Sequence, residues 1–251
     1  MRDAALFDYA CSLGDDSLIL GQRLSEWCGH APMLEVDLSL ANLGLDLLGQ
    51  ATHFLRLAGQ IEDRRRDEDA LAFRRDVLDF KNCLLVEQPN GDFAQTIARQ
   101  FLFSTYQELL LRELCGSKHS VIAAIAAKAV KEVTYHVRFA SEWVLRLGDG
   151  TDESRRRMSD GLEWLWRFGD ELFDVSEALE PLIAAGVACD VRRLRPEWDE
   201  QIARVLREAT LDAPKPRRGA RGGRSGHHSE HLGHLLTEMQ FLQRAYPGAK
   251  W

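Results

Sequence analysis

Apolar residues recur along most of this chain at intervals of three and four positions, the spacing that brings side chains onto one face of an α-helix. No convincing run alternates apolar and polar residues as a half-buried strand does. The sequence therefore predicts an all-α protein. The predicted helices cover about 6–28, 34–60, 68–86, 93–115, 118–147, 152–178, 197–208 and 228–245.

The predicted helix over 34–60 is apolar on more than half of its circumference, which is typical of a helix buried on most sides. Two long hairpins, 6–60 and 93–147, provide the four helices of a natural bundle core. We expect one domain over 1–251, a four-helix bundle with additional helices. The apolar residues of 34–60 form two stripes, Leu38/Ala41/Leu45/Leu48/Leu55 and Leu40/Leu43/Leu47/Ala51/Phe54.

The segment 213–226 interrupts the helical pattern with five cations, no acid and few residues that could pack. We predict a flexible basic loop there, followed by the C-terminal helix over 228–245. Its cations are either a contact site for an anionic partner or for the phosphates of a coenzyme A thioester, or a solvated linker. They are Lys215, Arg217, Arg218, Arg221 and Arg224.

Composition and charge narrow the class of protein. The apolar fraction is 45%, the charged fraction 28% and the net charge −7, so no basic field attracts nucleic acid or an anionic membrane. The sequence has neither a continuous apolar run of membrane-spanning length nor an N-terminal signal core. Five cysteines without paired spacing predict reduced, buried thiols. We expect a cytoplasmic protein.

Two positions resemble an incomplete metal motif. Carboxylate-bridged di-iron bundles take a Glu from each of two helices and Glu-x-x-His from each of the other two. At corresponding positions this chain has Asp46-Leu47-Leu48-Gly49 and Glu132-Val133-Thr134-Tyr135, each with an acid and without the histidine. The sequence therefore lacks a complete di-iron ligand set.

The heights of residues in the two hairpins suggest what replaces the metal. With turns near 30–31 and 117, Asp46 is level with Asp15 or Asp16, and Glu132 is level with the region of Arg99 to Phe103. A positively charged side chain at the height of Glu132 would repel a bound metal dication. We predict that Arg99 pairs with Asp46, Asp15 or Glu132, so that salt bridges occupy the place of a metal centre. The alternative is that these acids lie on solvated faces.

Two further groups have helical metal spacing. Glu132 and His136 are four residues apart, although a lone pair of this kind is more typical of a hydrogen-bonded core histidine. Near the C-terminus, His227 with His231 and Glu230 with His234 repeat the spacing where a helix begins. Capping and packing explain such a cluster better than an unspecific metal site.

Several longer runs together resemble the C subunits of bacterial phenylacetyl-CoA epoxidases, multicomponent oxygenases of aerobic phenylacetate breakdown. The resemblance covers nearly the whole chain. Its most specific parts are Glu26-Trp27-Cys28-Gly29-His30-Ala31-Pro32, Ala41-Asn42-Leu43-Gly44-Leu45-Asp46, Val86-Glu87-Gln88-Pro89-Asn90-Gly91, Leu165-Trp166-Arg167-Phe168 and Glu230-His231-Leu232-Gly233.

The resemblance implies a ferritin-like fold and a non-catalytic structural role. In that family the C subunit pairs with a homologous catalytic subunit, which carries the di-iron centre and binds the acyl-CoA. Other subunits include a small subunit and a flavin and iron–sulfur reductase. It follows that this chain holds no cofactor of its own, carries no catalytic residue and meets phenylacetyl-CoA only through the complex.

Two other functions remain open from the sequence. One is an autonomous ferritin-like di-iron oxygenase or iron-binding protein that uses Asp15, Asp46, Glu132 and His136. The other is a plain interaction module that contacts anions through the arginines between Arg217 and Arg224.

Overall fold

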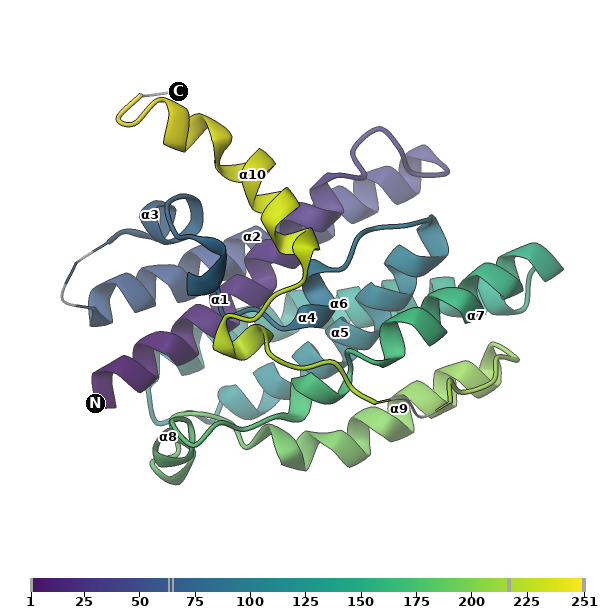
Figure 1. Ribbon diagram of the computed structural model, residues 1–251. Helices are drawn as coiled ribbons and strands as arrows, with labels where there is room; N and C mark the ends of the chain where they lie inside the picture. The colour runs from purple at the N-terminus through teal and green to yellow at the C-terminus, as the bar shows by residue number, and fades with distance from the viewer. Residues whose placement is uncertain (1, 63, 65, 216–217, 250–251) are drawn as a thin grey trace. The chain divides into compact units, whose positions relative to one another are not determined.

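The computed structural model describes residues 2–62, 64, 66–215 and 218–249, and the regular structure within these ranges is entirely helical (Figure 1). This confirms the predicted all-α class. The helices belong to two compact units, one formed by Met1–Pro89 with Arg221–Trp251 and the other by Asn90–Ala220. We call them unit 1 and unit 2. A single domain over 1–251 stays a prediction.

Unit 1 is built on the hairpin of α1 (Arg2–Ser25) and α2 (Leu34–Ile61). The helix α1 continues through Gly14. This glycine allows α1 and α2 to pack closely. A Cβ atom on Gly14 would lie 2.9 Å from Leu55 Cγ. The inner face of α2, including Leu40, Leu43 and Leu47, is fully buried. The hairpin predicted over 6–60 is therefore present.

The two helices of this hairpin are shifted from the predicted register. A Cβ on Gly21 would lie 3.3 Å from the Gly44 carbonyl oxygen and 3.2 Å from Leu48 Cγ, so Asp46 is level with Gly21. The prediction that Asp46 is level with Asp15 or Asp16 was wrong. Further turns over 26–30 follow α1 before α2 begins at Leu34.

The helix predicted over 68–86 is broken into three short pieces, so that prediction was wrong. They are α3 (Glu68–Phe73), the 3₁₀ turn η1 (Val77–Asp79) and α4 (Leu84–Glu87). The backbone N–H of Lys81 donates to Asp15 Oδ2 at 2.8 Å, and that of Cys83 donates to Asp16 Oδ1 at 2.7 Å. These N–H groups therefore donate to carboxylates of α1 and not to the backbone carbonyl groups of a continuous helix.

The C-terminal part of unit 1 contains η4 (Gly223–Ser225) and α10 (Glu230–Ala245). Leu232, Leu235 and Leu236 form the buried side of α10. The Gln240 amide donates to the carbonyl oxygens of Ala72 and Arg75 at 3.0 and 3.1 Å. These bonds satisfy backbone groups where the helical ladder of α3 has ended.

Unit 2 is built on a second hairpin, α5 (Phe93–Leu114) and α6 (Ser120–Gly148). The predicted N-cap of α5 is confirmed, because the Asp92 side chain accepts a hydrogen bond from Gln95 N at 2.9 Å. Beside α5 lies α7 (Asp152–Trp166), where a Cβ on Gly161 would be 3.0 Å from Gln95 Cα. This glycine allows close helix packing.

The remaining helices of unit 2 close its core around aromatic residues. The prediction that the sixth helix extends to 178 was wrong, since α7 ends at Trp166 and a 3₁₀ turn, η2, follows over Asp170–Phe173. The turn buries Phe173 against Trp198. Trp198 also donates its ring N–H to the Leu102 carbonyl at 3.0 Å. The other elements are α8 (Glu180–Ala184), η3 (Val191–Leu194) and α9 (Arg195–Glu208).

Two surface properties follow from the described residues. Within the described ranges, none of the helices combines the length and apolarity that a membrane crossing requires.

All five cysteines are free thiols, but Cys28 and Cys115 are exposed, so the prediction that every cysteine is buried was wrong. Burial raises the pKa of the Cys11 thiol to about 12, which keeps it protonated.

Candidate functional site

The acidic pair on α1 is fully buried in unit 1 and is neutralised by arginines. Asp15 accepts from both terminal nitrogens of Arg75, one of them at 3.0 Å, and from Lys81 N. The exposed fractions of the Asp15 and Arg75 side chains are 0% and 2%. Arg75 also lies 4.3 Å from the centre of the Phe80 ring. This carboxylate is therefore committed to a dry ion pair.

The neighbouring Asp16 is held by Arg224, from the segment predicted to be a flexible loop. Arg224 donates to Asp16 Oδ2 at 2.7 Å and to the Lys81 carbonyl at 3.1 Å. Burial raises the pKa of Asp16, and the charge of Arg224 opposes that rise. Arg224 is thus a structural residue of unit 1. Its contact with an anionic partner stays a prediction.

A third buried network joins α4 to the start of α10. Glu87 accepts from His228 Nδ1 at 2.7 Å, from Ser229 N at 2.6 Å and from the Asn82 amide at 2.9 Å. His228 Nε2 faces the Phe80 carbonyl oxygen at 3.0 Å. Both ring nitrogens face acceptors, so the imidazole is held in its doubly protonated, cationic form. Burial lowers the pKa of His228, but its bonds to Glu87 and Phe80 outweigh this and raise it overall.

The middle of α5 carries an unusual number of buried polar residues. Arg99 is fully buried and donates to Asn90 Oδ1. Gln100 and Ser104, one helical turn apart, are also fully buried, and among the described residues neither side chain has a hydrogen-bond partner. His136 on α6 is buried, as predicted. The pairing of Arg99 with Asp46, Asp15 or Glu132 stays a prediction, although Asp15 already has Arg75 as its partner.

The four residues of the incomplete motif lie nearer the surface. Asp46 and Gly49 are partly exposed, and a Cβ on Gly49 would meet no atom within 4 Å. Glu132 is 3.8 Å from the Lys128 ammonium. Tyr135 is 38% exposed and contacts Arg138, whose guanidinium lies 5.3 Å from its ring centre. The placement of Gly49 and Tyr135 is unlike that of residues that line a buried metal centre.

The donor set does not fit a di-iron centre. Among the residues that the structure describes, no group of three or more His, Cys, Asp or Glu side chains is arranged to hold a metal ion. In the C-terminal cluster, His227 and His234 are exposed, while His228 is hydrogen-bonded to Glu87. Packing, the explanation preferred for this cluster, is therefore confirmed for His228.

Three further cations of the basic loop lie at the surface. Lys215, Arg218 and Arg221 are exposed. Arg217 lies outside the described residues. A contact of these cations with an anionic partner stays a prediction.

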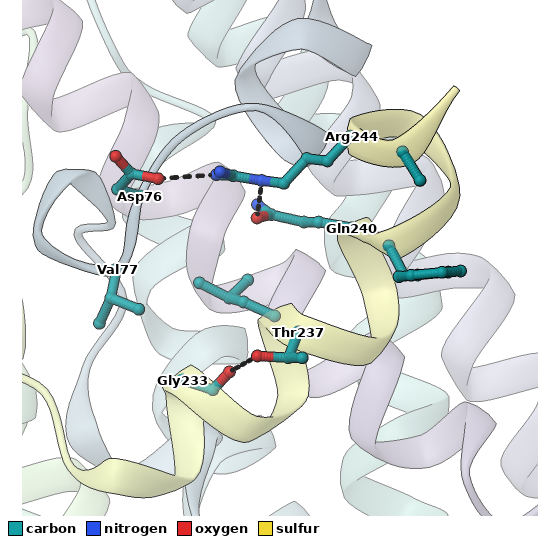
Figure 2. A pocket seen from close by; sticks show the side chains of 9 residues that line it. Asp76, Val77, Gly233, Thr237, Gln240 and Arg244 are labelled. Carbon is teal, nitrogen blue, oxygen red and sulfur yellow. Dashed lines mark hydrogen bonds and ion pairs between the residues drawn. The ribbon is translucent and has the colours of Figure 1, made fainter. Parts of the chain in front are cut away.

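Unit 1 also has a groove between η1 and α10, of about 490 Å³. Figure 2 shows how polar groups occupy its rim. Arg244 donates to Asp76 Oδ1 at 2.9 Å and to Gln240 Oε1 at 2.9 Å, while the Thr237 hydroxyl donates to the Gly233 carbonyl. These polar groups are used within unit 1, so they indicate packing and not catalysis.

Sequence reasoning missed Arg75, Glu87 and His228. Arg75 lies inside an apparently regular helical pattern, and Glu87 directly before a turn. One signal was available, because neighbouring acids inside the apolar pattern of α1 require buried partners if that face packs. Their partners are distant in sequence, and Asp16 and Arg224 are 208 residues apart.

Comparison with known proteins places the chain beside one protein family and one curated relative. The family model described as "Phenylacetic acid catabolic protein" matches residues 1–251. A relative from Escherichia coli (strain K12), the C subunit of 1,2-phenylacetyl-CoA epoxidase, is 51% identical over 243 residues, which cover 97% of this chain and 98% of the relative. The match over nearly the full length of both chains confirms the resemblance found in the sequence motifs.

Proposed function

The chain belongs to the phenylacetic acid catabolic protein family, and on this premise we propose that it is the non-catalytic structural subunit of a phenylacetyl-CoA ring epoxidase. In this proposal it pairs with a homologous catalytic subunit and stabilises it. The partner's di-iron centre supplies the oxygen chemistry. This chain supplies a folded surface on which the partner is held.

The observation that carries the proposal is the ion pair between Asp15 and Arg75. A carboxylate that binds iron must offer its oxygens to the metal, but both Asp15 oxygens already accept hydrogen bonds. A dication that took over the Asp15 carboxylate would leave the buried Arg75 guanidinium without its counter-charge and would be repelled by it. The acid that an autonomous iron enzyme would need is therefore occupied by a structural role.

The half-buried acids Asp46 and Glu132 allow a direct test of the non-catalytic role. The chain is co-purified with the catalytic subunit, and epoxide formation from phenylacetyl-CoA is measured in the complete complex. Asp46→Asn and Glu132→Gln, alone and together, should change kcat less than about twofold, because neither acid binds a reacting group in this account. Loss of kcat by 100-fold or more, with loss of iron from the complex, would show that these acids are metal ligands.

A second arm of the same experiment tests the structural role. Without this chain, the catalytic subunit should be recovered in lower soluble yield and with less activity per iron, since the surface that pairs with this chain is then uncovered. If the catalytic subunit alone is equally soluble and equally active, the structural role is wrong.

A further inference from the structure

Two polar side chains in the core of unit 2 receive no hydrogen bond from the protein. Gln100 and Ser104 lie one turn apart on α5, and both are fully buried. Among the residues that the structure describes, the Gln100 amide nitrogen and oxygen and the Ser104 hydroxyl have no hydrogen-bond partner. Buried polar groups without a partner are costly and rare in folded proteins. Two of them in adjacent turns of one helix therefore require an explanation.

The neighbouring Thr105 shows that α5 can satisfy a buried hydroxyl by itself. Thr105 is also fully buried, and its hydroxyl donates to the Phe101 carbonyl, one turn earlier, at 2.8 Å. The same bond to the preceding turn is open to a serine, but Ser104 does not make it. The Ser104 hydroxyl is therefore directed toward a partner other than the backbone of its own helix.

The stripe of α5 that carries both residues faces α6. It begins at Phe93, whose ring centre lies 5.0 Å from that of Trp143 on α6. It ends at Glu108, which accepts a hydrogen bond from the Thr134 hydroxyl of α6 at 2.8 Å. The two polar residues lie between these contacts, at intervals of seven and four positions, so all of them share one side of the helix.

The opposite side of α5 is packed by other elements of unit 2. The ring centres of Tyr106 and Phe173 of η2 are 5.7 Å apart. A Cβ on Gly161 of α7 would lie 3.0 Å from Gln95 Cα. The side toward α6 is thus the one that remains for Gln100 and Ser104.

The buried residues of α6 between Thr134 and Trp143 are His136, Phe139 and Ala140. None of them carries a carboxylate. Ala140 and Ser104 are both small, so side chains fill this height of the helix pair less completely than leucines would.

We propose that unit 2 binds an ordered water molecule here, which bridges the Gln100 amide and the Ser104 hydroxyl. The Cβ atoms of residues four apart on a helix are about 5–6 Å from each other. A water that makes two hydrogen bonds of about 2.8 Å spans such a separation. The water is thus part of the folded core of unit 2, and its removal is costly.

The chemistry of the two side chains selects a neutral ligand. An amide and a hydroxyl both donate and accept hydrogen bonds, as water does. They offer neither the carboxylates that hold a dication nor a positive charge that would hold an anion. The inference concerns the core of unit 2 and does not depend on the proposed function.

A crystal structure of the full-length chain, at a resolution that orders internal water, tests the site directly. We expect a water peak within about 3.2 Å of both side chains. The peak should be lost in the double variant Gln100→Met with Ser104→Ala. A wild-type structure without this peak, or with the Gln100 amide bonded directly to the Ser104 hydroxyl, would overturn the proposal.

Urea unfolding tests whether the two side chains share one ligand. Gln100→Met and Ser104→Ala should each raise the equilibrium constant of unfolding about 2- to 10-fold, because each removes one anchor of the water. The double variant should raise it no further than the larger single change, since either change already breaks the bridge. If each single variant is instead more stable than the wild type and the two effects add, both groups are buried without a shared water and the proposal is wrong.

Thr105→Val is the matched control. Its hydroxyl is equally buried on α5 but has its own partner in the Phe101 carbonyl. The effects of Thr105→Val and Gln100→Met should therefore add. Circular dichroism checks that each variant keeps its helix content. The same degree of non-additivity for Thr105 as for Ser104 would contradict a bridge between Gln100 and Ser104.

Discussion

Asp15 and Arg75 form a two-pronged ion pair that is almost completely removed from water. The two residues lie on α1 and just after α3, so the pair fixes an irregular segment against the first hairpin. Arg75 is positioned further by the Phe80 ring below its guanidinium. Neither charge could remain buried without the other, and the energetic consequences can be measured.

Replacing Arg75 should destabilise the chain strongly. Arg75→Met leaves the Asp15 carboxylate buried with a single backbone donor and should cost about 3–5 kcal/mol in the free energy of unfolding. The double variant Arg75→Met with Asp15→Leu should recover most of that loss, because no unpaired charge remains. Urea unfolding gives both values.

The neighbouring Arg74 provides the control, since its side chain is exposed. Arg74→Met should change the free energy of unfolding by less than about 0.5 kcal/mol. A cost below about 1 kcal/mol for Arg75→Met, in the range of a surface pair, would contradict the assignment of a buried ion pair.

The basic loop should divide into structural and non-structural arginines. Arg224→Ala removes the partner of buried Asp16 and should cost about 3 kcal/mol in the free energy of unfolding. Arg218→Ala, at an exposed position, should cost less than about 0.5 kcal/mol. Thermal and urea unfolding compare the two, and equal effects would show that Arg224 does not anchor the segment.

The His228–Glu87 pair should make stability depend on pH. The folded pKa of His228 is raised above its ordinary value of 6.5, so the stabilisation is complete below that pH and is lost as the pH rises through the folded pKa. His228→Gln should therefore be less stable than the wild type at pH 6, by about 1.5–3 kcal/mol for the lost charged hydrogen bonds. The difference should shrink as the pH rises above 6.5.

Chemical unfolding at a series of pH values measures this difference. His227→Gln is the matched control, because His227 is exposed and precedes His228 directly. A His228→Gln deficit that stays constant or grows with rising pH would contradict a cationic His228 in the folded chain.

Gly49 should tolerate a side chain. In the middle of α2 a glycine costs roughly 1 kcal/mol relative to alanine, and a Cβ at this position meets nothing within 4 Å. Gly49→Ala should therefore raise the free energy of unfolding by about 0.5–1 kcal/mol. Gly59→Ala should lower it, because its Cβ would lie 2.0 Å from the Arg66 carbonyl oxygen. Urea unfolding of both variants checks the contrast.

The sequence predicted the long helices well, because their apolar periodicity and caps are local signals. The bounds of α2, α5 and α6 agree with the predicted helices to within a few residues. The failure over 68–86 has a non-local cause. Two carboxylates on α1 take the N–H groups of Lys81 and Cys83, and no local pattern reveals this competition.

In the candidate site too, local features could be predicted from the sequence and partners distant in sequence could not. The acid at Asp15 and the missing histidines at Gly49 and Tyr135 were visible in the sequence, and salt bridges were expected near them. The cations that fill this role for Asp15 and Asp16 are Arg75 and Arg224, which are brought close only by tertiary folding. Composition marked 213–226 as a loop, but it could not reveal a partner 208 residues away.

We propose that this chain has a structural role and binds no iron of its own. The most direct test is the iron content of the chain, purified alone and as a complex with the catalytic subunit, by elemental analysis against protein concentration. We expect far less than one iron per chain in the isolated protein, and iron in the complex in proportion to the catalytic subunit. Near-stoichiometric iron in the isolated chain would contradict it.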